Sequence, residues 1–140
     1  MFTREDPRTE RLHALPIFSA CSRKELEIVG GMADEVRLRE GTILTQQGEP
    51  GHECFVLLEG GAEVKIGRRV VAHIGPGEIV GEMALLESES RTATVVTTTA
   101  TRVLVMTRPT FTAVLEKCPN LARRVMRTLA RRLREVQSAA

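Results

Sequence analysis

Two glycines, a carboxylate and an arginine between positions 77 and 95 have the types and spacing to bind a phosphate. Gly77 and Gly81 lead into Glu82, and Met83–Leu86 then supply good helix formers. The first N–H groups of a helix are unpaired, and the positive end of its dipole favours an anion. Arg91 could add a fork of donors, whereas an ionised Glu82 only accepts, as from a ligand hydroxyl. A phosphate beside a hydroxyl predicts a nucleotide.

Taken alone, each of these charged side chains has a simpler interpretation. Arg91 could be a solvated loop residue paired with Glu87 or Glu89, because charged side chains are mostly exposed. Glu82 could be an acidic residue that only stabilises the first turn of a helix. We favour ligand binding because the glycines, the carboxylate and the arginine occur together and in order.

The stretch from Gly77 to Val95 resembles the phosphate-binding cassette of the cyclic-nucleotide-binding domain family. That family includes bacterial catabolite activators, regulatory subunits of cyclic-nucleotide-dependent kinases, and gated channels. The resemblance lies in GEIVGEMAL, a short polar spacer, and then RTATV. Glycines at 48, 60 and 75–77 also match, which extends the resemblance to about residues 10 to 137.

The resemblance implies a role for each part of this cassette. It implies that Glu82 binds the ribose 2′-hydroxyl, that Arg91 binds the cyclic phosphate, and that Gly81 lets the backbone approach the ribose. Backbone amides after Glu82 and the Thr92 hydroxyl would complete the phosphate cradle. The expected ligand-binding residues are Val80, Gly81, Glu82, Met83, Ala84, Leu85, Arg91, Thr92, Ala93 and Arg132.

Thr92 bears on the identity of the base. In cyclic-GMP-dependent kinases a threonine at this place also contacts the guanine amino group, but bacterial cAMP binders commonly carry serine or threonine there too. Thr92 is therefore compatible with both ligands, and we expect cAMP in preference to cGMP. Further residues that could line the base pocket, or belong simply to the core, are Val64, Val71, Ile79, Ala93 and Val95.

Short apolar or alternating runs, separated by turn residues, occupy positions 34 to 107. Many short strands without helices between them favour a sandwich or closed barrel over a parallel sheet. The resemblance implies the more specific fold: mainly β with flanking helices, a cupin-like β-roll (jelly-roll barrel). The clearest expected strands are 54–58, 62–66, 70–74, 92–98 and 101–106.

Helical patterns flank this β region on both sides. Residues 8–32 are expected to be helical with a break at Pro16, and Ser22 and Glu25 have the form of a capping box. Gly30-Gly31 is expected to end or loosen that helix. The C-terminal helices, over about residues 109–137, are a short one after Pro109 and a longer one from Pro119.

Length and composition favour one globular domain, expected over residues 8–140. Hydrophobic residues make up 42% and charged residues 27%, and no apolar run approaches the roughly 20 residues of a membrane span. The three cysteines and three histidines show no disulfide or metal-ligand spacing, so we expect neither a metal nor a cofactor. We expect a cytoplasmic bacterial protein that does not itself insert into a membrane.

The helix from Pro119 carries six arginines against one glutamate, which leaves three interpretations open. The arginines could form a solvated face, or Arg132 could close over the base through a cation–π contact, as the resemblance to bacterial channel domains implies. A nucleic-acid surface is the least favoured, because no aromatic residues interleave. An apolar stripe could pair two chains into a homodimer: Leu121, Val125, Leu129 and Leu133.

Three classes of function differ in what they require of the sequence. A non-catalytic sensor, in which ligand binding repositions the C-terminal helix to control an effector, is the favoured hypothesis. The alternative is the truncated sensor part of a catabolite-activator-type regulator, since no helix-turn-helix follows the long helix before Ala140. An enzyme is not expected, because clustered histidines and serine-nucleophile motifs are absent from the sequence.

Overall fold

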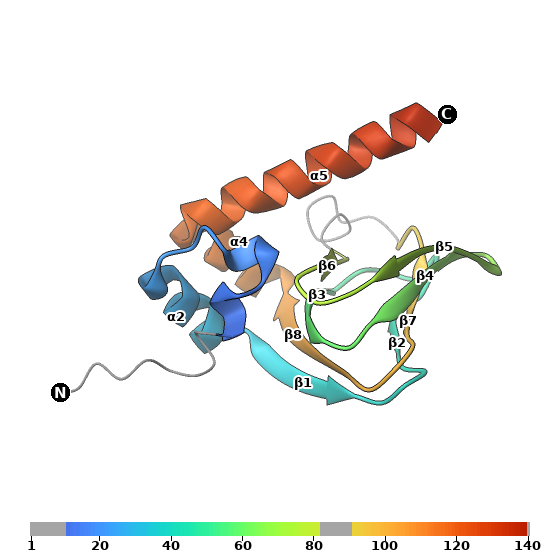
Figure 1. The fold of residues 1–140 in the computed structure, drawn as a ribbon, viewed down its shortest axis with the longest axis horizontal. Helices are drawn as coiled ribbons and strands as arrows, with labels where there is room; N and C mark the ends of the chain where they lie inside the picture. Colours follow the sequence, from blue (N-terminus) through green and yellow to red (C-terminus); the bar gives the residue numbers. More distant parts are fainter. Residues whose placement is uncertain (1–10, 82–90, 140) are drawn as a thin grey trace.

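Eight short strands of the described chain form two antiparallel sheets (Figure 1). The computed structural model describes residues 11–81 and 91–139, without the side chains of residues 132, 133 and 135–139. One sheet runs in the order β1 (Asp34–Leu38), β8 (Thr101–Thr107), β3 (Glu53–Glu59), β6 (Ile79–Val80). The other runs in the order β2 (Ile43–Thr45), β7 (Thr94–Thr97), β4 (Ala62–Ile66), β5 (Arg69–Ile74).

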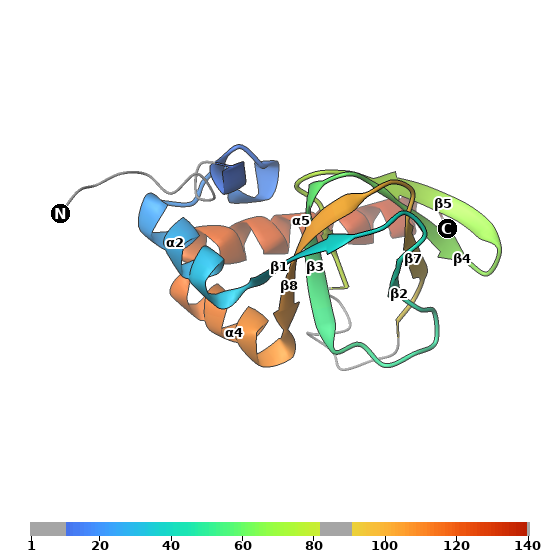
Figure 2. The same ribbon diagram turned by 90° about the horizontal axis from the view of Figure 1, so that it is seen from below.

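The helices gather at one end of these sheets, and the last one runs from that end towards the opposite side of the molecule (Figure 1). They are the 3-10 turn η1 (Pro16–Phe18), α2 (Arg23–Met32), α4 (Arg108–Lys117) and α5 (Pro119–Ala139). In Figure 2, α5 starts beside α2 and α4, and its far end lies on the side of the molecule that carries β4 and β5. It packs against η1 and α4.

Strand β3 is buried on both faces and separates two hydrophobic cores. Cys54 and Val56 face a core shared with the helices, whereas Phe55 and Leu57 face a core between the two sheets. This division follows from the two-residue period of a strand, which sends successive side chains to opposite faces. Strand β8 is divided in the same way, with Leu104 on the helix side and Val103 on the sheet side.

The expected mainly β fold with flanking helices is confirmed, including the long helix from Pro119 and the hairpin expected over 62–66 and 70–74, whose second strand begins one residue earlier, at Arg69. Of the two alternatives left open, a sandwich or a closed barrel, the described strands do not form the closed barrel, because they pair as two separate sheets of four. They therefore form an open β-roll.

The helical region expected up to residue 32 does end there, but the helix end expected at Gly30-Gly31 and the helix start expected after Pro109 are wrong. Helix α2 continues through Gly30 and Gly31 to Met32, where Val29 and Met32 pack into the helix-side core. This packing outweighs the cost of about 0.5–1 kcal/mol that a glycine adds inside a helix. Helix α4 begins before Pro109 rather than after it, because the first turn of a helix tolerates proline.

Candidate functional site

Arg91 is a buried arginine, only 8% exposed, that joins two segments of the chain. Its Nη1 donates to the Gly81 carbonyl over 3.0 Å, and its Nη2 donates to the Glu53 carbonyl. Its backbone is held as well: the Arg91 N–H donates to Glu49 O over 2.8 Å, and the Gly48 N–H donates to Arg91 O over 2.9 Å. Both ends of the residue are therefore fixed by backbone groups.

Gly81 is required at its position by the guanidinium of Arg91. Its φ is +86°, in the left-handed region that favours glycine. A Cβ atom here would lie 2.3 Å from Arg91 Nη1 and 3.0 Å from the Glu53 carbonyl oxygen. The guanidinium thus occupies the space that any other side chain at this position would need.

The two carbonyls that bind Arg91 are brought together by the pairing of β6 with β3. Phe55 is opposite Val80 in this register, and both side chains are buried in the core between the sheets. Gly81 directly follows Val80, and Glu53 begins β3 two residues before Phe55. Burial of these two apolar side chains therefore sets the acceptors for Arg91.

The remaining predicted residues within the described chain lie close to Arg91 in sequence but differ in exposure. Val80 is buried in the core between the sheets, Ala93 is half-buried, and Thr92 is exposed. Ala93 is held by its carbonyl, which accepts a 3.0 Å hydrogen bond from the Thr45 hydroxyl.

Four predicted ligand-binding residues, Glu82, Met83, Ala84 and Leu85, lie outside the described residues. Arg132 lies on α5, but its side chain is also outside the description. Their roles therefore stay predictions.

The candidate base-pocket residues divide between different surroundings. Val95 is buried in the core between the sheets, and the half-buried Val64 packs against it. Ile79 instead packs in the core on the helix side, and Val71 is 40% exposed on the edge strand β5. Of the candidate base-pocket residues, only Val64 and Val95 therefore share the inter-sheet core with Val80.

Two partners of Arg91, the carbonyl of Glu53 and the turn at Gly48-Glu49, could not be predicted from the sequence, because both act through backbone atoms. Within residues 11–81 and 91–139, no group of three or more His, Cys, Asp or Glu side chains could hold a metal ion. None of the helices in the described part of the chain has the length and apolar character to cross a membrane.

The described chain is a two-sheet β-roll with helices at one end and a buried arginine, Arg91, in the segment after its short strand β6. A family model described as "Cyclic nucleotide-binding domain" matches residues 35–118. The chain belongs to this family, and the matched region runs from β1 to the C-terminal cap of α4.

Individual relatives share this domain. The Pycsar effector protein XpPycTIR of Xanthomonas perforans is 36% identical over 81% of this chain and 38% of its own length. The cyclic AMP receptor protein of Thermus thermophilus is 29% identical over 86% of this chain and 58% of its own length. A crystal structure of the Thermus thermophilus catabolite activator protein superposes with a TM-score of 0.80 at 28% identity, covering 89% of this chain and 61% of that one. The chain spans less than two thirds of each of these proteins.

Proposed function

We propose that this chain is a sensor that binds a cyclic nucleotide, cAMP in preference to cGMP, and passes the signal to α5. The observation that carries the proposal is the buried Arg91, held by the Gly81 and Glu53 carbonyls inside the motif typical of the family. The name of the Thermus relative, a cyclic AMP receptor protein, supports cAMP as the ligand.

The surroundings of Arg91 suit a phosphate. The two carbonyls are neutral dipoles, so they orient the guanidinium without cancelling its positive charge. A charge-assisted hydrogen bond is stronger than a neutral one, and low exposure reduces its screening by solvent. Glu82 would then bind the ribose hydroxyl, and Thr92 would add a donor to the phosphate.

A path of packed contacts supports transmission from the cassette to α5. Gly77, in the turn before β6, lies so close to η1 that a Cβ there would be 2.7 Å from Pro16 Cδ. The turn η1 in turn packs against α5. A displacement of the Gly77 turn therefore has a direct route to α5. A ligand shifts the equilibrium between two positions of α5 only if it binds the protein more tightly in one of them than in the other.

Calorimetric titration with cAMP, cGMP and 5′-AMP tests the proposal. We expect cAMP to bind in the micromolar range or tighter, and 5′-AMP to bind far more weakly. Arg91→Ala should lower the affinity by about 100-fold, because a hydrogen bond to a charged group contributes roughly 1.5–3 kcal/mol. Arg37→Ala, on the exposed face of β1, is the control and should leave affinity unchanged. Absence of binding by both cyclic nucleotides would refute the proposal.

A second candidate is the sensor part of a longer transcription regulator. The observation in its favour is the match to 58% of the Thermus cyclic AMP receptor protein. Gel-shift measurements on the complete gene product, with and without cAMP, distinguish the two candidates. Ligand-dependent and sequence-specific DNA binding supports the regulator, whereas a ligand response without DNA binding supports a sensor with another effector.

A further inference from the structure

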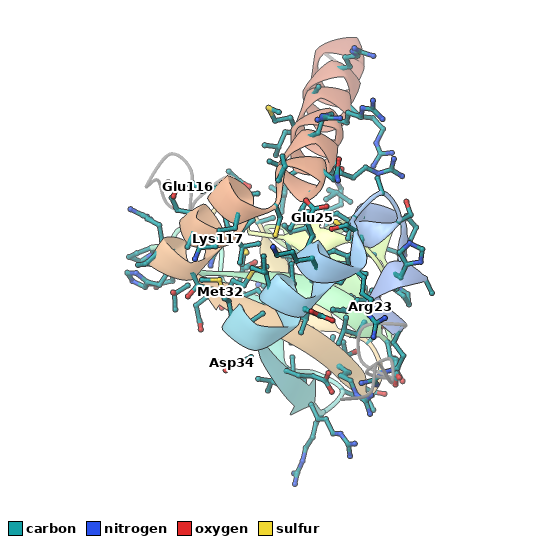
Figure 3. All side chains as sticks on the ribbon, turned by 90° about the vertical axis from the view of Figure 1, so that its left-hand side faces the viewer. Arg23, Glu25, Met32, Asp34, Glu116 and Lys117 are labelled. Carbon is teal, nitrogen blue, oxygen red and sulfur yellow. The ribbon has the colours of Figure 1, made fainter. Side chains whose placement is uncertain are left out.

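Glu25 is a buried carboxylate, 7% exposed, that connects two helices distant in the sequence. Its Oε1 accepts from the Ser22 N–H over 2.9 Å and from Asn120 Nδ2 over 2.7 Å. Its Oε2 accepts from the Asn120 N–H over 3.1 Å. One side chain on α2 therefore binds both the backbone and the side chain of a residue in the first turn of α5. Figure 3 shows Glu25 where α2 meets the start of α5.

These contacts make Glu25 a cap for two helix N-termini at once. With Ser22 it forms the reciprocal capping box of α2. Asn120 is the second residue of α5, and the N–H groups of a first turn have no partner within their own helix. The residue before Pro119 is Cys118, which is not one of the usual capping types. The cap of α5 is therefore supplied by a residue 95 positions away.

The surroundings of Glu25 strengthen this junction. Cys118 Sγ donates to the Glu25 carbonyl oxygen over 3.6 Å, and the Cys118 side chain is fully buried. Burial by itself raises the pKa of the Glu25 carboxyl, but the hydrogen bonds from Ser22 and Asn120 outweigh it and hold the pKa below its ordinary value. The carboxylate is thus kept charged at the positive end of the α5 dipole.

Burial along α5 is concentrated near this junction. Leu121 and Val125 are each 2% exposed in the helix-side core, and Leu129 is only partly buried. Met126 is 62% exposed, and Arg131 and Arg134 are exposed as well. Among the described side chains of α5, the strongest fixation is therefore in the first two turns.

We propose that Glu25 is the pivot of α5: it fixes the first turn of this helix to α2, and the rest of α5 rotates about that point when ligand binds. The proposal rests on the proposed sensor function for the ligand-driven part of the movement. It assigns Glu25 and Asn120 as positioning residues that touch no ligand. A rotation by a given angle then displaces each residue in proportion to its distance from Asn120.

The size of the expected displacements follows from helix geometry. At a rise of about 1.5 Å per residue, Arg123 lies about 4.5 Å and Arg134 about 21 Å along the axis from Asn120. A rotation of about 20° would move them by about 1.6 Å and about 7 Å, respectively. A helix that slides or shifts as a whole would instead move both positions by the same distance.

Distances between pairs of spin labels test this expectation on the full chain. One label is placed at Arg37→Cys on β1, and the other at Arg123→Cys, Arg127→Cys or Arg134→Cys, all exposed positions. The native cysteines are at most 5% exposed, and labelling of the parent protein checks that they do not react. With cAMP, we expect the change in distance to grow from residue 123 to residue 134. Equal changes at the three positions would overturn the proposal.

Three variants test whether Glu25 itself is responsible. Glu25→Gln replaces one acceptor oxygen of the carboxylate by a donor. Asn120→Ala removes the side-chain hydrogen bond from Asn120 to Glu25 but keeps the one from the Asn120 backbone N–H. Without ligand, we expect the distance distribution at Arg123→Cys to widen about twofold in Glu25→Gln and less in Asn120→Ala. Glu27→Gln is the matched control, because Glu27 is an exposed neighbour on α2 that pairs with Arg23. It should leave the distribution unchanged.

The distance distributions measured without ligand test the pivot independently of the proposed sensor function. If no cyclic nucleotide produces heat in calorimetry, the sensor proposal fails, yet a widened distribution in Glu25→Gln still supports the pivot. If distributions in Glu25→Gln and Asn120→Ala match the parent protein while cAMP binds normally, the pivot is refuted and the sensor stands. Asn120→Ala keeps the test valid if Glu25→Gln does not fold.

Discussion

Replacement of Gly81 by alanine tests directly whether the held position of Arg91 is what the ligand requires. The new Cβ would lie 2.3 Å from Arg91 Nη1 and 3.0 Å from the Glu53 carbonyl oxygen. The carbonyl belongs to the backbone of β3, so the guanidinium is the group that must move. A displaced guanidinium would no longer meet the phosphate, and a hydrogen bond to a charged group contributes roughly 1.5–3 kcal/mol, so we expect cAMP affinity to fall by about 100-fold.

Gly41→Ala is the matched control for the backbone part of this effect. Gly41 has a φ of +83°, close to the +86° of Gly81, but a Cβ there would meet no atom within 4 Å. Both variants bear the cost of an alanine in the left-handed region, about 1–2 kcal/mol. Gly81→Ala should lower the free energy of unfolding by at least about 3 kcal/mol more, because Arg91 also loses its two carbonyl partners at roughly 1.5–3 kcal/mol each.

Urea unfolding measures the stability of the two variants, and calorimetry measures their affinity for cAMP. We expect Gly41→Ala to be destabilised but to bind cAMP within about twofold of the parent protein, because its altered backbone lies away from Arg91. If Gly81→Ala binds cAMP as tightly as Gly41→Ala, the position of Arg91 observed here is not required by the ligand. The reasoning that assigns Arg91 to the phosphate would then be wrong.

Three further predictions concern the helices and their core. Because the folded-state pKa of Glu25 lies below its ordinary 4.5, the carboxylate contributes stability above pH 4.5 that is lost as the pH falls through the lower folded-state pKa. We therefore expect Glu25→Gln to be less stable at neutral pH and to lose less stability in acid than the parent protein. Urea unfolding midpoints between about pH 7 and about pH 3 measure both effects. Gly77→Ala, whose Cβ would lie 2.7 Å from Pro16 Cδ, should separate η1 from the turn and reduce the cAMP-dependent change in distance at the far end of α5. Phe111→Ala should lower the free energy of unfolding by about 3–5 kcal/mol, whereas Met126→Ala, at a 62% exposed position, should change it by less than about 0.5 kcal/mol in the same urea measurement.

Features set by neighbouring residues were predicted well from the sequence. The capping box of Ser22 and Glu25 depends on residues three positions apart, and the structure contains both of its hydrogen bonds. The hairpin of β4 and β5 follows from an alternating run at 62–66 and a second short run at 70–74, joined by a turn at Gly67. Residues 54–58 are apolar without interruption, and they form a strand buried on both faces.

Features set by long-range packing could not be predicted in the same way. The second partner of Glu25 lies 95 positions away on another helix. The Glu53 carbonyl binds Arg91 through a backbone atom, and every residue type carries such an atom. The helix end expected at Gly30-Gly31 was wrong because burial of Met32 and its neighbours outweighs a local preference.

The shared strand β3 couples the stabilities of the two ends of the molecule. Its even-numbered residues Cys54 and Val56 complete the core beneath the helices, and its odd-numbered residues Phe55 and Leu57 complete the core between the sheets. Neither core can lose this strand and remain closed, so the helical end and the β-roll are expected to unfold together in a single cooperative transition. The backbone amides of β3 should accordingly be among the last in the protein to exchange with solvent.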